Sequence, residues 1–226
     1  MSDHEALRHP AVAPEADEAD GGDAPAGGQG LRARKRLSAM LRIQSVALDL
    51  FETRGFDAVT VEEVAEASEV SPSSVYRYFG TKEQLVLWDQ LDPEMIGRLR
   101  DAVADDVPLD GVRRIVTRAI AGLTPQDERR LARRMRLVMA TPSVEQASVA
   151  ESYTLAEQLG ELLAERLGRP AVDLEVQVFS HALVGGFLGM LHHWHGTDFQ
   201  APLAEVAEQS FDIITAGLHV VAGRPA

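Results

Sequence analysis

Cysteine is absent from the sequence, which excludes a disulfide scaffold, a thiolate zinc site and a cysteine nucleophile. Long hydrophobic runs are also lacking: the longest, 182–191, lies between two histidines and is too short to span a bilayer. The first thirty residues contain no apolar segment of the kind found in a secretory signal. Of the 226 residues, 45% are hydrophobic and 25% are charged, which is typical of a globular protein. We therefore expect a soluble, cytoplasmic protein with a sizeable core.

Positive charge is scarce over the whole chain but not over every part of it. The formal net charge is −13, which by itself argues against a nucleic-acid partner. Residues 1–30 hold seven acidic residues against one arginine, whereas residues 31–80 hold seven residues of each sign. A basic run precedes the first acidic residue of the second range: Arg32, Arg34, Lys35 and Arg36. A DNA-binding protein needs a local basic surface rather than a basic total, so the net charge does not exclude DNA.

Composition and hydrophobic periodicity divide the chain into an N-terminal tail and a helical remainder. Residues 1–30 contain so few apolar side chains that burying them cannot offset the entropy of ordering, and we expect a disordered acidic tail. This tail either competes with DNA for the basic run or is a solvated leader. Residues 31–226 show helical periodicity almost throughout, with no strand pattern longer than a few residues. The expected fold class is all-α.

Capping signals predict where the helices begin and end. An apolar face over 40–51 indicates a helix that ends at Gly55. Thr60-Val61-Glu62-Glu63 is a capping box for a short second helix, and Ser71-Pro72 provides a cap and a first-turn proline for a third. Thr81-Lys82-Glu83-Gln84 repeats the capping-box pattern at the start of a fourth. Beyond it, turn residues separate longer predicted helices at 110–122, 126–140, 143–167, 171–195 and 201–221.

The first three predicted helices form a helix-turn-helix pattern, because the second and third are short and joined by a tight turn. A recognition helix needs small or polar residues at its N-terminal end and an apolar face behind them. In the third helix, Val75 and Phe79 lie on one face. Ser73, Ser74 and Arg77 remain for the other face, so the stretch is suited to a major groove of DNA.

Residues 60–85 resemble the DNA-binding signature of the tetracycline-repressor (TetR) family of transcriptional regulators. The matching positions are Thr60, Val64, Ala65, Val70, Ser71, Tyr76, Tyr78, Phe79, Lys82, Glu83 and Leu85. The resemblance extends back through the first helix and covers roughly 35–90. It implies an N-terminal three-helix helix-turn-helix DNA-binding domain, placed here at 31–80, and a larger C-terminal helical domain at 81–226 for ligand binding and dimerisation.

Three residues depart from the pattern of the family. Glu69 stands where members usually have glycine, so it either adopts a left-handed conformation at a cost or the turn differs. Ser73 replaces another frequent glycine, and Glu62 lies where some members place a base-reading arginine.

The resemblance implies a set of DNA-facing residues: Thr60, Ser71, Ser73, Ser74, Tyr76, Arg77, Tyr78 and Lys82. Arg77 either reads guanine through O6 and N7 or contacts phosphate from the helix surface. We expect Tyr76 to contact a phosphate and Tyr78 to pack at the edge of the domain. The basic run is either a solvated end of the tail or a phosphate or minor-groove contact.

For the C-terminal part the resemblance implies an effector pocket and a homodimer interface. Bulky apolar residues that suit a pocket, or else plain core, are Trp88, Leu91, Met95, Leu99, Met135, Met139, Phe187, Met190 and Trp194. Small and aliphatic residues on two late helices suit a twofold interface, or else packing within one chain: Gly185, Gly189, Ala207 and Ile214. The stretch 88–93 resembles a branch of the family with acyl-coenzyme-A-like ligands. Five arginines in 129–136 either hold ligand phosphates, or form a solvated helix face or salt bridges between helices.

Other chemistry finds little support in the sequence. His192, His193 and His195 invite a metal or catalytic interpretation, but no carboxylate completes a standard ligand spacing. No nucleophile elbow, phosphate loop or dinucleotide fingerprint is present, so we expect no enzyme activity, cofactor or metal. The prediction is a ligand-responsive regulator, a repressor, that binds a palindromic operator as a dimer and is released by a small apolar or amphipathic effector. The alternatives are a helical ligand- or partner-binding protein that does not read DNA, and a histidine-dependent metal enzyme.

Overall fold

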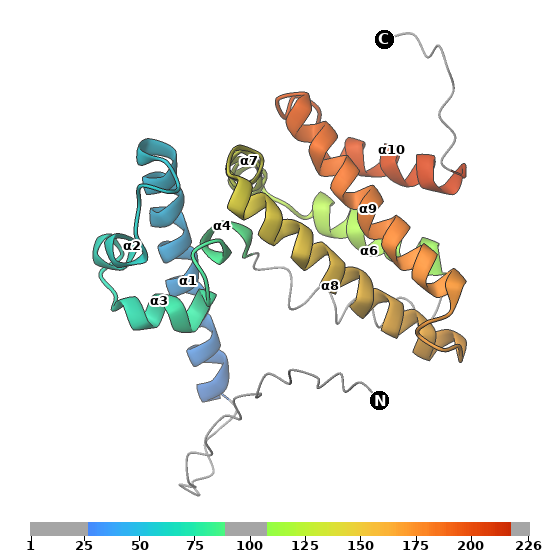
Figure 1. Ribbon diagram of the computed structural model, residues 1–226, viewed down its shortest axis with the longest axis horizontal. Coiled ribbons are helices and arrows are strands. Elements are labelled where there is room, and N and C mark those ends of the chain that lie inside the picture. The colour runs from blue at the N-terminus through green and yellow to red at the C-terminus, as the bar shows by residue number, and fades with distance from the viewer. Residues whose placement is uncertain (1–26, 89–107, 218–226) are drawn as a thin grey trace, which may run out of the picture. The chain divides into compact units, whose positions relative to one another are not determined.

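The computed structural model describes residues 27–88 and 108–217, with the side chains of 32–88 and 109–217 (Figure 1). Every regular element in these ranges is a helix, which confirms the all-α class. The chain divides into two units, 1–36 and 37–226, and of the first only the start of helix α1 (Gly27–Arg54) is described. The predicted tail, 1–30, lies largely outside the described residues, and α1 begins inside its last four positions.

Capping signals correctly indicate the end of the first helix and the starts of the second and third. Helix α1 ends at Gly55, whose φ of 86° suits glycine, and α2 (Val61–Ala67) opens on the expected Thr60–Glu63 capping box. Helix α3 (Pro72–Phe79) has Ser71 as its N-cap and proline in its first turn. The apolar faces of these helices meet in one core that includes Ile43, Phe51, Val64, Val75 and Phe79.

The turn between α2 and α3 contains the only non-glycine residue of positive φ in this three-helix part, Glu69, at φ 55°. Its N–H donates to the carbonyl of Glu66 at 3.0 Å, and the N–H of Val70 donates to the carbonyl of Ala65 at 3.0 Å. These two bonds form a Schellman motif with Glu69 at the position that normally holds glycine. Of the two expectations for this residue, the left-handed conformation is the one observed.

Helix α4 spans Gln84–Leu87 and begins three residues after the predicted cap at Thr81. The expected capping box is absent: the hydroxyl of Thr81 accepts only a 3.4 Å bond from the N–H of Gln84. Leu85, Val86 and Leu87 are buried in the same core as the first three helices. The packing therefore continues past the boundary predicted at residue 80.

Four C-terminal helices lie within three residues of their predicted ranges: α6 (Pro108–Ala121), α7 (Pro125–Ala140), α8 (Pro142–Leu167) and α9 (Leu174–Gly196). The fifth, α10 (Leu203–Thr215), ends before the predicted residue 221. Proline in the first turn starts three of them, α6, α7 and α8. Helices α8 and α9 run side by side, and α10 crosses near α9 and α6 (Figure 1). Two cores result, one around Leu163 and Phe211 and one around Met190 and Trp194.

Gly186 allows the close approach of α9 and α10. A Cβ atom at this position would lie 2.9 Å from Cδ1 of Ile214, nearer than two carbon atoms normally come. Helix α9 is also the described helix that is long and apolar enough to cross a membrane, by length and composition alone. Core helices pass the same test, and α9 contributes side chains to both C-terminal cores.

Candidate nucleic-acid interface

Three serines form a connected hydroxyl network at the N-terminal end of α3. The hydroxyl oxygen of Ser71 accepts a bond from the N–H of Ser74 at 3.2 Å. It lies 3.0 Å from the hydroxyl of Ser73 and 2.9 Å from that of Ser74. Ser71 and Ser73 are exposed and Ser74 is half-buried. This end of the helix therefore presents short polar groups, which leave room for close approach to a base edge or a phosphate.

Arg77 is held above the same serines. Its Nη2 donates to the hydroxyl of Ser74 at 3.2 Å, and its guanidinium carbon lies 5.1 Å from the ring centroid of Tyr78. The residue remains exposed, and so does its neighbour Tyr76, at 47%. Two contacts thus orient a planar five-donor group over the N-terminal half of α3, the part of a recognition helix that faces base edges.

The opposite face of α3 is fixed in the core. Val75 is 1% exposed and Phe79 is 6% exposed, and the ring of Phe79 meets Trp88 edge-on at 5.9 Å. Tyr78 is half-buried against this core, as expected. Because one face is fully packed, α3 has a single orientation in which only its serine and arginine face is free.

The side chain of Lys82 contacts the loop after α1 in this structure. Its ammonium group donates to the carbonyl of Phe56 at 2.5 Å and lies 4.2 Å from the centroid of that ring. The side chain is half-buried. In this structure Lys82 therefore links the start of α4 to the loop after α1 through a hydrogen bond and a ring contact with Phe56. Sequence alone does not distinguish this role from a phosphate contact.

Thr60, the remaining predicted DNA-facing residue, is exposed at the start of α2. Its hydroxyl accepts from the N–H of Glu63, and the carboxylate of Glu63 accepts from the N–H of Thr60 at 2.8 Å. That backbone bond, followed by the pairing with Arg54, lowers the pKa of Glu63. The cap fixes the first turn of α2.

Of the five arginines of α7, three form salt bridges, namely Arg130, Arg133 and Arg136, and Arg129 is exposed. Arg133 contacts both Glu52 and Asp49 of α1, with nitrogen–oxygen distances of 2.8 and 2.6 Å. Arg136 lies 3.7 Å from Asp198, with its guanidinium over the ring of Phe199. Arg134 donates to the carbonyls of Val86 and Leu87. The sequence indicates the cluster but not its partners.

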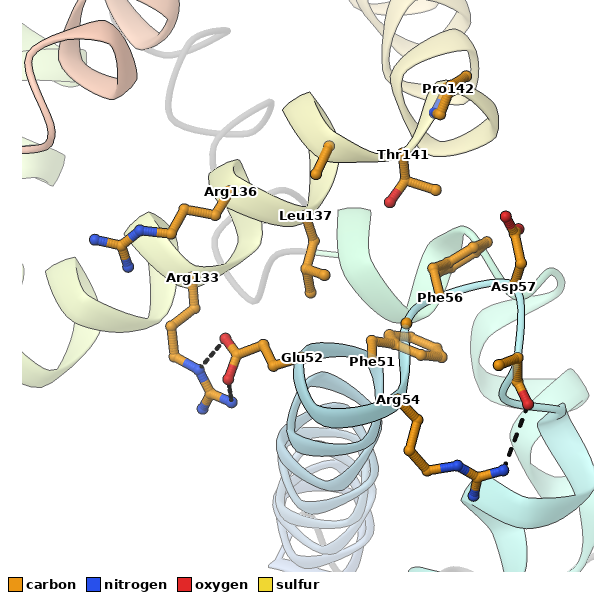
Figure 2. Close-up of a pocket in the computed structure, with 13 residues that line it drawn as sticks. Phe51, Glu52, Arg54, Phe56, Asp57, Arg133, Arg136, Leu137, Thr141 and Pro142 are labelled. Carbon is orange, nitrogen blue, oxygen red and sulfur yellow. Dashed lines mark hydrogen bonds and ion pairs between the residues drawn. The ribbon is translucent and has the colours of Figure 1, made fainter.

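A cleft of about 800 Å³ opens between the end of α1, the following loop and the corner between α7 and α8 (Figure 2). Its lining combines buried apolar residues such as Phe56 and Leu137 with the charged side chains of Glu52, Arg133 and Arg136. Among the described residues of the predicted effector pocket, none lines this cleft.

The predicted pocket residues fall into different surroundings. Leu91, Met95 and Leu99 lie outside the described residues. Met135, Met190 and Trp194 are buried together in one C-terminal core, and Met139 packs beside it. Trp88 belongs to the N-terminal core, and Phe187 is 39% exposed. The structure therefore does not gather these side chains around one described cavity, because most of them fill the cores between helices.

The predicted interface residues also differ from one another. Gly185 and Gly189 are exposed with nothing within 4 Å of a would-be Cβ, as an interface requires. Ile214 is half-buried against α9, whereas Ala207 is fully buried in the chain's own core and cannot contact a partner. The helical spacing of Ala207 predicts that it lies on an apolar face, but it does not predict which neighbouring helix covers that face.

The histidines of α9 do not form a cluster of metal ligands. His192 and His193 are exposed, and the ring of His195 packs on Phe199 at 5.6 Å between centroids. Within 27–88 and 108–217, no group of three or more histidine, cysteine or acidic side chains is arranged to hold a metal ion.

The fold and the α3 surface define a helix-turn-helix DNA-binding protein with a helical C-terminal part. Two family models match the chain: the bacterial regulatory proteins of the tetR family over 43–87, and the MftR C-terminal domain over 106–219. The second covers half of the chain. The chain belongs to the TetR family of transcriptional regulators.

Individual relatives agree with this assignment. MftR of Mycobacterium tuberculosis is 25% identical over 187 residues, which cover 82% of this chain and 93% of that protein. The regulator TcmR of Streptomyces glaucescens is 32% identical over 155 residues, covering 66% and 67%.

Solved structures share the fold. The complex of SmeT with triclosan superposes with a TM-score of 0.56 at 17% identity, covering 84% of this chain and 98% of that one. FadR of Thermus thermophilus, bound to lauroyl-CoA, gives 0.52 at 24% identity, covering 83% and 98%.

Proposed function

We propose that this TetR-family regulator is an effector-responsive repressor that binds a palindromic operator as a homodimer, acts in the cytoplasm and catalyses no reaction. The α3 surface supports this proposal most strongly. Ser73, Tyr76 and Arg77 are exposed on it, and Val75 and Phe79 on the other face of the helix are buried in the core. Arg77 is the base-reading candidate, since a bidentate arginine matches the O6 and N7 of guanine.

The surface of α9 supports a homodimer. Leu174 is 76% exposed and Val178 is 59% exposed, and Ala182, Gly185 and Gly189 continue the same apolar face. A second cleft, of about 450 Å³, lies between this face and Ile214 of α10. A continuous apolar face of this kind marks an interaction surface. Pairing it with its twofold copy would place two recognition helices on one duplex, as a palindromic operator requires.

The domains that we propose differ slightly from the sequence prediction. The DNA-binding domain begins at residue 31 and extends through α4, because Leu85, Val86 and Leu87 share the core of α1 to α3. The ligand-binding and dimerisation domain follows to residue 226. The acidic residues 1–30 precede both.

For the effector we propose a small amphipathic molecule of the acyl-coenzyme-A class. The stretch 88–93 resembles the branch of the family with such ligands, and the structural relative FadR is solved with lauroyl-CoA. Release requires that the effector bind one conformer more tightly than the operator-bound conformer. Lauroyl-CoA should therefore lower operator affinity, and coenzyme A alone is the control. Unchanged operator affinity with bound lauroyl-CoA would contradict this effector class.

The operator test is selection of bound duplexes from a random DNA library at physiological salt. Wild-type protein should enrich one palindrome, and Arg77→Ala should lose discrimination at one position in each half-site, by about 1–3 kcal/mol. The matched control is Arg129→Ala, which removes an exposed arginine of α7. No enrichment by a folded wild-type dimer would overturn the proposal in favour of a ligand- or partner-binding protein.

A further inference from the structure

Among the described residues, the helices that carry the DNA-reading surface contact the C-terminal part mainly through α7. Leu137 and Val138 of α7 and Val144 of α8 are buried in the core of the N-terminal helices. This apolar contact is small, because it involves three buried residues of the C-terminal part. Hydrogen bonds and ion pairs of defined geometry beside it add a restraint on the angle between the two parts.

Arg133 supplies the directional contact to α1. Its Nε and Nη2 lie 2.8 Å from the two carboxylate oxygens of Glu52, and Nη2 also lies 2.6 Å from a carboxylate oxygen of Asp49 (Figure 2 shows the pairing with Glu52). The planar guanidinium therefore makes a fork-shaped contact with one acid and a second bond to another acid one turn earlier on α1. Three bonds from one rigid group define an orientation and not only a distance.

This ion-pair cluster, Arg133 with Glu52 and Asp49, lies at the wall of the larger cleft and is partly shielded from water. The side chain of Arg133 is 29% exposed, against 40% for Glu52 and 65% for Asp49. Its hydrogen bonds, first that to Glu52, raise the pKa of Arg133, so its charge is permanent. Pairs in such a position are screened less by salt than fully exposed ones.

Arg134 of α7 and Gln44 of α1 both donate hydrogen bonds to the C-terminal end of α4. Arg134 Nε donates to the carbonyl of Val86 at 2.7 Å, and Gln44 Nε2, from the buried face of α1, donates to the carbonyl of Trp88 at 2.7 Å. These bonds satisfy carbonyl groups that the end of a helix leaves without partners. Adjacent arginines of α7 thus contact different elements, α1 through Arg133 and α4 through Arg134.

We propose that Arg133 is a positioning residue for operator recognition: its pairing with Glu52 and Asp49 sets the orientation of the DNA-binding helices on α7 and so the half-site spacing that the dimer accepts. The part that concerns half-site spacing rests on the proposed function. Arg133 itself does not touch DNA in this proposal, and it acts through α1, which shares the N-terminal core with α3.

The orientation can be measured without DNA, because the chain has no cysteine of its own. Glu66→Cys on α2 and Gln158→Cys on α8, both exposed, take a pair of spin labels, and dilution with unlabelled protein isolates the distance within one chain. We expect one narrow distance distribution in the wild-type background and a broader one in Arg133→Gln. Arg129→Gln removes an equal charge from the same helix and should leave the distribution narrow. Equal widths in the two variants would overturn the inference.

Two further variants separate orientation from folding. Glu52→Gln keeps Arg133 and its bond to Asp49, so it should broaden the distribution less than Arg133→Gln. The exchanged pair, Arg133→Glu with Glu52→Arg, should narrow it again, because the opposite charges are restored. If Arg133→Gln does not fold, a narrow distribution in Glu52→Gln would contradict the proposal by itself.

The functional readout is affinity for the selected palindrome with base pairs inserted between its half-sites. Wild-type protein should bind the selected spacing more tightly than the altered ones. In Arg133→Gln the ratio of these affinities should be about fivefold smaller, which is the factor expected from the loss of one such ion pair. An equal loss of affinity at every spacing would show a role in folding only and would overturn the inference. Absence of any selected palindrome for wild type would instead refute the proposed function, while the label distances still decide the orientation.

Discussion

Replacing Glu69 with glycine should stabilise the protein, because this residue is held in a conformation that suits glycine. Its φ is 55°, and the Schellman bonds of its own N–H and of Val70 require that conformation. A left-handed conformation costs a residue with a side chain about 1–2 kcal/mol. Glycine removes that cost but gives up about 0.5–1 kcal/mol through the larger freedom of the unfolded chain. The net expectation is a gain of about 0.5–1 kcal/mol.

The assay is urea unfolding at neutral pH, in which Glu69→Gly should raise the midpoint without changing the slope. Glu69→Ala is the control, because it removes the same exposed carboxylate and keeps the unfavourable φ. We expect Glu69→Ala to be no more stable than wild type. If alanine and glycine stabilised the protein equally, the effect would arise from charge and the argument from backbone conformation would be refuted.

Three further predictions concern single contacts. Lys82→Met should lower stability by about 1 kcal/mol and leave the salt dependence of operator binding unchanged, because its ammonium is bonded to the protein's own backbone; a shallower salt slope would instead indicate a phosphate contact. Glu63→Gln should make the free energy of unfolding depend less on pH in acid. Because the pKa of Glu63 is lowered in the folded state, its bond to Thr60 stabilises the protein above the ordinary carboxyl pKa, and this stabilisation is lost as pH falls through the pKa of the folded state. Unfolding at a series of pH values measures the change. Gly186→Leu should cost about 1–3 kcal/mol in urea unfolding because of its approach to Ile214, and Ile214→Ala should recover part of that loss.

Local features of the fold could be predicted from the sequence because they depend on residues close together in the chain. The capping box at Thr60, the cap at Ser71 and the end of α1 at Gly55 each involve a single turn of backbone. The same holds for the face of α3, since Val75 and Phe79 are separated by one helical turn. These features sufficed to place the recognition helix and its exposed side chains.

Contacts between distant residues could not be predicted in the same way. The partners of Arg133 lie 81 and 84 residues away, and that of Gln44 lies 44 residues away, so no local spacing indicates them. Lys82 has a suitable position for a phosphate contact but meets the Phe56 carbonyl, which only the folded chain brings near. Ala207 has the periodicity of an exposed apolar face and is buried because another helix covers it.

A comparison of two duplexes decides whether the α3 surface reads a specific DNA sequence. Wild-type protein is titrated at one physiological salt concentration with the palindrome that it selects and with a scrambled duplex of the same composition. The account predicts at least about a 10³-fold preference for the palindrome, and a much smaller preference for Arg77→Ala. Equal affinity for both duplexes by a folded dimer would contradict it, because only phosphate contacts would then remain.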